Sequence, residues 1–87
     1  MYSVKYHKQV VKFLQKQEKS FRAQVIDIFD SLKQNPKNYE QYDIKSLKGF
    51  KNKYRLRIGK YRIIYSLLDD KLIIEVIKAG SRGDVYK

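Results

Sequence analysis

The sequence lacks cysteine and tryptophan, and it contains one histidine and one proline among 87 residues. Without cysteine the chain can form neither a disulfide framework nor a thiolate metal site. The absence fits a reducing cytoplasm, where we expect the protein to act. The single histidine, His7, excludes a pair of histidines working as acid and base. The acids form no pattern typical of a two-metal site, so we expect no metal and no cofactor.

Long hydrophobic runs are also missing from the chain. No window approaches the roughly 20 apolar residues of a membrane span, and the N-terminus lacks the apolar run of a signal peptide. Apolar residues nevertheless make up 43% of the sequence. That fraction is enough for a well-patterned core, and we expect one small domain over residues 1–87.

Acidic residues are few, because nine Asp and Glu stand against twenty Lys and Arg, for a formal net charge of +11. The excess is concentrated in residues 45–62, where eight of eighteen residues are basic, and no acid occurs from Ile44 to Leu68. Such a charge predicts association with polyanions: nucleic acid, an acidic membrane surface or an acidic protein. The alternative is a merely soluble basic protein, which would not need this local concentration.

Apolar spacing predicts two helices in the first half of the chain. Before them, alternation over Tyr2–Tyr6 predicts a short strand. His7 to about Gln17 places its apolar residues on one helical face, and Phe21–Leu32 gives the clearest stripe. We expect Ser20 to be the N-cap of the second helix. This helix ends before Asn35-Pro36, because the residue preceding proline avoids helical geometry.

The second half predicts a three-strand meander. The polar stretch 37–53 before it is expected to be a loop, with at most a short turn around Ile44 and Leu47. After the last strand, Ala79–Gly83 is expected to leave the sheet. The predicted strands are Tyr54–Ile58, Tyr61–Leu68 and Leu72–Lys78, with turns at Gly59-Lys60 and Asp69–Lys71.

This order of elements predicts an α+β domain (β-α-α-β-β-β). Two N-terminal helices should pack on one face of a small, mainly antiparallel, twisted sheet, leaving the opposite face without a helix. Alternation places Leu56 and Ile58 on the helical side of their strand, with Arg55 and Arg57 on the uncovered side.

The predicted hairpin brings Arg55, Arg57 and Arg62 onto adjacent strands. Like charges so close repel one another, so the cluster predicts a bound anion, and phosphate oxygens suit bidentate arginine contacts. A solvated, charged sheet face is the alternative. We expect Glu75 on the same face, ion-paired with one of the arginines, with a catalytic base as its alternative role. His7 is expected to be a capping or surface residue.

Three segments taken together, Leu47–Gly49, Tyr54–Tyr65 and Gly80–Tyr86, resemble the RelE family of the RelE/ParE superfamily of toxin–antitoxin toxins. The resemblance covers the whole chain in length, in element order and in the Asn-Pro after the second helix. The specific part is the combination of an aromatic, basic, apolar, basic run, a turn, Tyr-Arg and an apolar strand ending in Tyr.

The resemblance implies the toxin component of a type II toxin–antitoxin system. Such a toxin is an mRNA interferase, a metal-independent endoribonuclease that enters the ribosomal A site and cleaves the bound codon. The ribose 2′-hydroxyl attacks the adjacent phosphate, leaving a 2′,3′-cyclic phosphate and a 5′-hydroxyl. The implied partners are a cognate antitoxin protein and the ribosome with its mRNA, and no membrane. The alternative is a ParE-like toxin that inhibits DNA gyrase by protein–protein binding.

The resemblance also assigns roles to individual residues. The arginines would stabilise the charge that builds on the phosphorane, and the C-terminal tyrosine would stack on or position a base. The implied catalytic residues are Arg55 and Arg57 (the two strand bases of the family), Arg62 (its Tyr-Arg arginine), Arg82 (the arginine after the last strand) and Tyr86. The lysines expected to bind RNA are Lys45, Lys48, Lys51, Lys53 and Lys60.

One departure from the family leaves the proton acceptor open. In the best-known member of the family both strand bases are lysines, whereas Arg55 and Arg57 stay protonated and cannot take a proton. The alternatives are that Lys53 or another nearby group takes the proton, that the substrate phosphate or the ribosome helps, or that catalysis is slower. Some relatives use a glutamate–histidine pair instead, and neither residue occurs here in a matching place.

Overall fold

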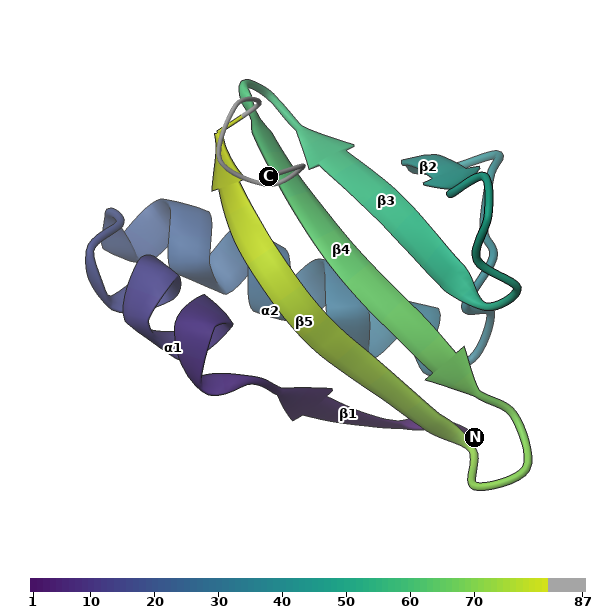
Figure 1. Cartoon of the computed structure of the whole chain (residues 1–87). Helices are drawn as coiled ribbons and strands as arrows, with labels where there is room; N and C mark the ends of the chain where they lie inside the picture. The colour runs from purple at the N-terminus through teal and green to yellow at the C-terminus, as the bar shows by residue number, and fades with distance from the viewer. Residues whose placement is uncertain (82–87) are drawn as a thin grey trace.

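Two helices pack against one face of a five-stranded sheet in the part of the chain that the structure, a computed structural model, describes, residues 1–81 (Figure 1). This arrangement confirms the predicted α+β class with a mainly antiparallel sheet. The elements in chain order are β1 (Ser3–Tyr6), α1 (Lys8–Gln15), α2 (Lys19–Leu32), β2 (Asp43–Ser46), β3 (Lys53–Ile58), β4 (Tyr61–Leu68) and β5 (Ile73–Ser81).

The sheet has the strand order β1-β5-β4-β3-β2, with β1 and β2 at its two edges. Strands β2 to β5 pair antiparallel with their neighbours, whereas β1 runs parallel to β5. An extra residue in β5, Ile77, shifts the register between Ile64 and Tyr65 of β4. Such a bulge increases the local twist, and the sheet in Figure 1 is strongly twisted.

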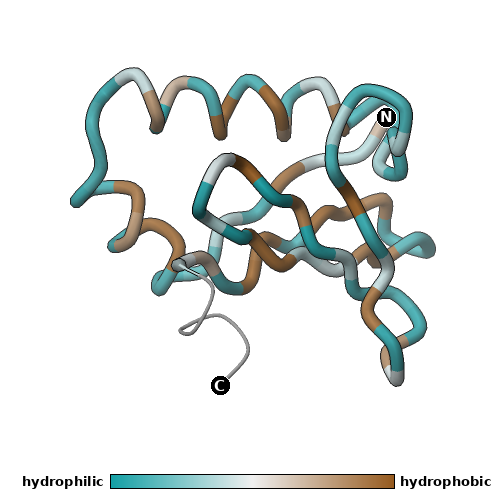
Figure 2. Tube along the Cα trace, turned by 90° about the horizontal axis from the view of Figure 1, so that it is seen from above, coloured by the Kyte–Doolittle hydropathy of each residue, from teal (hydrophilic) through white to brown (hydrophobic). Residues whose placement is uncertain are grey.

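The hydrophobic core lies between the two helices and the sheet. Figure 2 shows hydrophobic stretches of the long helix turned toward the strands. The ring of Phe29 meets the rings of Tyr6 and Tyr65 edge-on, with centroids 6.0 and 5.5 Å away. Within residues 1–81, no helix is both long and apolar enough to cross a membrane. The largest fully buried side chains of the core are Tyr65, Phe29, Leu32, Leu56, Ile63, Ile74, Val10, Val25 and Val76.

The sequence interpretation missed strand β2, which lies inside the stretch predicted to be a loop. Its four residues contain one apolar side chain, Ile44, so no alternation could indicate a strand. Pairing with β3 determines this strand, because Ile44 lies opposite Leu56 and is buried in the core. A strand this short is stabilised by its neighbour rather than by its own sequence.

Two other predicted boundaries were wrong. Helix α2 begins at Lys19, with Glu18 rather than Ser20 as its N-cap, and the Glu18 side chain makes no capping hydrogen bond. Strand β5 continues to Ser81, although Ala79–Gly83 was predicted to leave the sheet. Gly80 and Ser81 still pair with the first two residues of β4, because backbone hydrogen bonding does not depend on the side chains that the prediction used.

Stability is expected to fall in alkaline solution because of Tyr6. Burial raises the pKa of Tyr6 to about 12, and the charge of Asp30 adds a smaller increase. The pKa of an unfolded tyrosine is about 10. The contribution of neutral Tyr6 to the free energy of unfolding is therefore complete below pH 10 and is lost as the pH rises through 12. Urea unfolding at pH 7, 9 and 11 would measure the loss. Tyr6→Phe should lose less between pH 9 and 11, and equal losses would contradict the assignment.

Candidate functional site

Strand pairing places Arg57 and Arg62 side by side in one row across the uncovered face of the sheet. Arg57 of β3 lies opposite Arg62 of β4 on one side and opposite Asp43 of β2 on the other. Arg62 in turn lies opposite Gly80 of β5, which has no side chain. Like charges directly opposite in a sheet repel each other. The row therefore concentrates positive charge where β3 ends and β4 begins.

Asp43 connects the two arginines of β3. Its Oδ1 accepts a hydrogen bond from Nη2 of Arg55, and its Oδ2 forms an ion pair with Nε of Arg57, both at 2.7 Å. Sequence analysis expected Glu75 to be the acid paired with one of these arginines, but Asp43 forms the ion pairs instead. Asp43 lies one residue before the acid-free stretch, and the pairing of β2 with β3 brings it back against the arginines. A charge-assisted contact of this length fixes both guanidinium groups.

The two arginines of β3 differ in exposure. The Arg57 side chain is 49% exposed, as expected for the uncovered face, whereas the Arg55 side chain is only 12% exposed. Arg55 lies between Lys45 and Ile64 in the register, and its Nε is buried with no hydrogen-bond partner among residues 1–81. Of the two β3 arginines, Arg57 is therefore the more accessible to an anion from solvent, whereas Arg55 and Arg62 are both intermediate in exposure.

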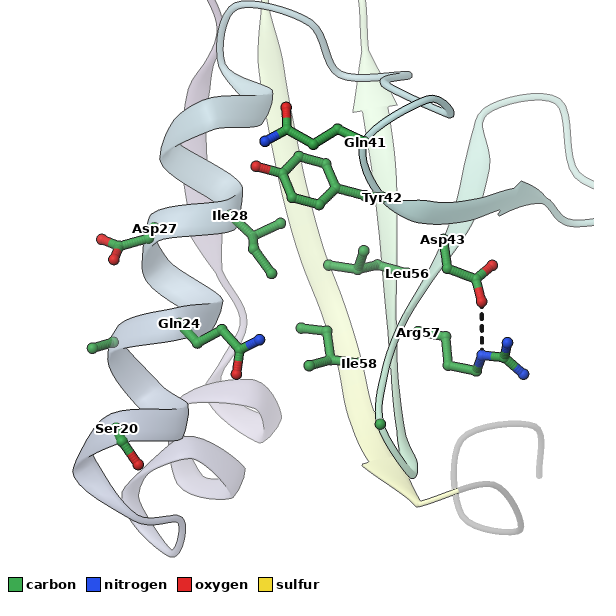
Figure 3. A pocket seen from close by; sticks show the side chains of 12 residues that line it. Ser20, Gln24, Asp27, Ile28, Gln41, Tyr42, Asp43, Leu56, Arg57 and Ile58 are labelled. Atoms are coloured by element: carbon green, nitrogen blue, oxygen red, sulfur yellow. Dashed lines mark ion pairs between the residues drawn. The ribbon is translucent and has the colours of Figure 1, made fainter.

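A groove of about 680 Å³ lies on the other side of the same strands, between α2 and β3 (Figure 3). Ile28, Leu56 and Ile58 form apolar parts of its lining, and Asp27 adds an acid. In Figure 3 the Asp43–Arg57 ion pair points away from α2. Asp43 and Arg57 also line the groove, but its apolar and acidic lining near α2 is unlike that of a phosphate site, and the row of Arg57 and Arg62 lies on the opposite, uncovered face.

The five lysines expected to bind RNA are spread along β3 rather than gathered at one point. Lys45 and Lys53 project from the uncovered face, opposite Arg55 and Ser66. Because a six-residue strand spans about 17 Å, the two ends of this basic surface lie well apart. Lys48 and Lys51 are exposed in the β2–β3 loop at one end of β3, and Lys60 is exposed in the β3–β4 turn at the other.

Among residues 1–81, Glu75 pairs with His7 and with no arginine, contrary to the sequence-based expectation. Its Oε2 lies 3.3 Å from Nε2 of His7. His7 directly precedes α1 as its N-cap residue, and its side chain makes no capping hydrogen bond. Glu75 pairs with Ser66, four residues along β4 from Arg62, which is about 13 Å. The His7–Glu75 pair is therefore separate from the arginine row, and sequence spacing gave no sign of it.

Two predicted site residues, Arg82 and Tyr86, lie outside the described residues. The last described residue of β5, Ser81, pairs with Tyr61 at the start of β4, next to Arg62. Among residues 1–81, no group of three or more His, Cys, Asp or Glu side chains is arranged to hold a metal ion. This part of the site presents guanidinium groups, two of which Asp43 holds in place, and such groups can bind phosphate and stabilise its charge.

Comparison with known proteins supports a toxin family. A family model described as the ParE toxin of the type II toxin–antitoxin system, parDE, matches residues 4–86. A protein named as a RelE1 toxin from Methanocaldococcus jannaschii is 40% identical over 86 residues, covering 99% of this chain and 96% of that protein. A RelE-like toxin protein from Escherichia coli is 32% identical over 89 residues, covering 98% and 90%.

Solved structures agree with the sequence matches. A chain in the crystal structure of the archaeal RelE–RelB complex from Pyrococcus horikoshii superposes with a TM-score of 0.84 at 37% identity, covering 97% of this chain and 98% of that one. The isolated RelE toxin of Escherichia coli superposes with a TM-score of 0.76 at 23% identity, which supports the fold. The chain therefore belongs to the RelE family of toxins, within the RelE/ParE superfamily of type II toxin–antitoxin systems.

Proposed function

We propose that this toxin is a ribosome-dependent mRNA endonuclease. It cleaves the codon in the ribosomal A site without a metal ion and so inhibits translation. The 2′-oxygen forms a bond to the adjacent phosphorus while the bond from phosphorus to the 5′-oxygen breaks. The products are a 2′,3′-cyclic phosphate and a 5′-hydroxyl, and one proton passes from the 2′-hydroxyl to a base while the leaving 5′-oxygen gains another.

The observation that carries this proposal is the row of Arg57 and Arg62 on the uncovered face, with Asp43 fixing Arg57. A phosphorane carries more negative charge than the phosphate it forms from. Donors already fixed in place stabilise that charge without reorganising during the reaction. Arg55 would support the row from its buried position, and Arg82 and Tyr86 are proposed to complete the site.

The proton acceptor is constrained by the position of Lys53. Lys53 lies four residues along β3 from Arg57, about 13 Å away, at the opposite end of the strand. Its Nζ rests over the ring of Phe50, 4.5 Å from the centroid. This geometry favours RNA binding for Lys53 over proton transfer at the arginine row. We propose that the substrate or the ribosome takes part in the proton transfer.

The proposed partners are the ribosome with its mRNA and a cognate antitoxin, and the proposed place of action is the cytoplasm. Related RelE chains have been crystallised with RelB. The charge of +11 and the basic face would attract ribosomal RNA as well as the mRNA, because neutralised phosphates release counterions. An antitoxin that covers this face with acids would block the same surface.

A second candidate function is inhibition of DNA gyrase through protein contacts. It is favoured by the family model that matches residues 4–86, which is described as a ParE toxin. Such a protein would need a docking surface but no arranged phosphate site. The ion-paired arrangement of Asp43, Arg55 and Arg57 beside Arg62 is more than docking requires, so RNA cleavage remains the first candidate.

The two functions are separated by primer extension on mRNA held in stalled ribosomes, with naked mRNA as the control. We expect cuts inside A-site codons only when the ribosome is present. A parallel assay would follow DNA supercoiling by gyrase, which should continue at its normal rate. Growth arrest with intact mRNA and blocked supercoiling would instead establish the gyrase function and reduce the arginine row to a contact surface.

A further inference from the structure

Asp43 fixes the direction in which Arg57 points. Its Oδ2 takes Nε of Arg57 at 2.7 Å, so the two terminal nitrogens of that guanidinium are free of the carboxylate. These two nitrogens form a planar fork that matches two phosphate oxygens. Among residues 1–81 neither terminal nitrogen has a hydrogen-bond partner. The half-exposed end of Arg57 is thus set at a defined angle on the uncovered face.

We propose that Asp43 is a positioning residue for RNA cleavage, which holds the fork of Arg57 toward the scissile phosphate and keeps this contact while RNA is bound. The inference rests on the proposed function and adds to it a residue that does not touch the substrate. Among residues 1–81, the residues that the family resemblance implies as catalytic lie on β3 and β4. Asp43 comes instead from β2, the short edge strand.

Arg55 explains why Asp43 can serve as a fixed point. Nη2 of Arg55 holds the other carboxylate oxygen at 2.7 Å, and the Arg55 side chain is largely buried. A buried guanidinium that lost its carboxylate would carry an uncompensated charge, so this contact resists rearrangement. The chain of contacts therefore runs from the buried Arg55 through Asp43 to the exposed Arg57. Contacts from such supporting residues hold a functional side chain in its productive geometry.

The charge of Asp43 also weakens RNA binding, so the proposal predicts opposite effects on binding and on catalysis when this charge is removed. Its negative charge contacts Arg55 and Arg57 and lies in the same row as Arg62, where it weakens the attraction for RNA phosphates. Removing the charge should strengthen RNA binding, while the freed arginine loses its orientation and catalysis slows. A residue that only stabilised the fold would not produce these opposite effects.

The test compares Asp43→Asn with the wild-type toxin. Asparagine has nearly the same shape, but it offers one oxygen and cannot hold two guanidinium groups. We expect kcat for A-site cleavage to fall about tenfold or more. Binding of a single-stranded RNA oligonucleotide with 2′-O-methyl riboses should tighten. The slope of log K against log salt should steepen by about 0.7, the value for one additional phosphate contact.

The matched control is Asp30→Asn, which removes the same charge from the ion pair with Lys33 on α2. It should leave kcat and the salt slope unchanged. Asp43→Glu, which retains both carboxylate oxygens, should recover most of the lost kcat. Asp43→Asn that cleaves at the wild-type rate, or that shows slower cleavage with an unchanged salt slope, would overturn the positioning role.

If Asp43→Asn fails to fold, a measurement on the wild-type protein can test the proposal instead. In ¹⁵N NMR, the Nε proton of Arg57 should be protected from solvent exchange both in the free protein and with the 2′-O-methyl RNA bound. Loss of that protection on RNA binding would overturn the proposal. A wild type that cleaves no codon would contradict the proposed function, whereas the salt slope and the exchange measurement would still decide whether Asp43 holds Arg57 while RNA is bound.

Discussion

Arg62→Ala is expected to slow codon cleavage by about two to three orders of magnitude, which is the usual effect of removing one fixed donor to a transition-state oxygen. The fold should be at least as stable as before. Arg62 lies directly opposite Arg57, and no ion pair to Arg62 is present among residues 1–81. Its removal relieves a like-charge contact. Single-turnover cleavage on programmed ribosomes and urea unfolding would measure the two effects.

Two controls accompany Arg62→Ala. Arg62→Lys keeps the charge but replaces the planar fork with a point charge, so its cleavage rate should fall between those of wild type and alanine variant. Lys71→Ala removes one positive charge from the exposed turn between β4 and β5, at the opposite end of β4 from Arg62, and should cleave normally. If Arg62→Ala cleaves normally, or if Lys71→Ala loses as much, net charge rather than the arginine row explains the activity.

The elements that carry their own pattern could be predicted from the sequence. The apolar stripe of α2 and the alternation in β3 fixed which face of the sheet the helices cover, and that face was predicted correctly. The juxtaposition of Arg57 and Arg62 followed from the tight turn at Gly59, which has a positive φ of 57° that glycine readily adopts. A short hairpin determines its own register, so local sequence was sufficient.

The parts that depend on distant pairing could not be predicted. Strand β2 has no pattern of its own, and without it Asp43 appears as an ordinary loop acid outside the basic segment. The contact between His7 and Glu75 joins residues 68 positions apart. Alternation correctly placed Arg55 on the uncovered face, but alternation cannot show how far its neighbours bury it. Side-chain environment depends on tertiary packing, which local periodicity does not contain.

Phe29→Ala is expected to produce the largest loss of stability. The Phe29 side chain is fully buried, and its ring packs edge-on against Tyr6 of β1 and Tyr65 of β4. Removing a buried phenylalanine costs about 3–5 kcal/mol, through lost burial and the cavity left behind. Small domains have a total stability of about 5–15 kcal/mol, so a large part would be lost. The urea midpoint should fall by about 2 M.

Ile26→Ala is the matched control for Phe29→Ala, because it shortens an apolar side chain on the same helix that is 44% exposed. Surface changes of this kind usually stay within about 0.5 kcal/mol. The Phe29 ring touches Tyr65, and Tyr65 belongs to the strand that carries Arg62. Any loss of cleavage in Phe29→Ala should therefore follow the unfolded fraction and recover when a stabilising osmolyte refolds the protein. Equal midpoints for the two variants would contradict the packing of α2 against the centre of the sheet.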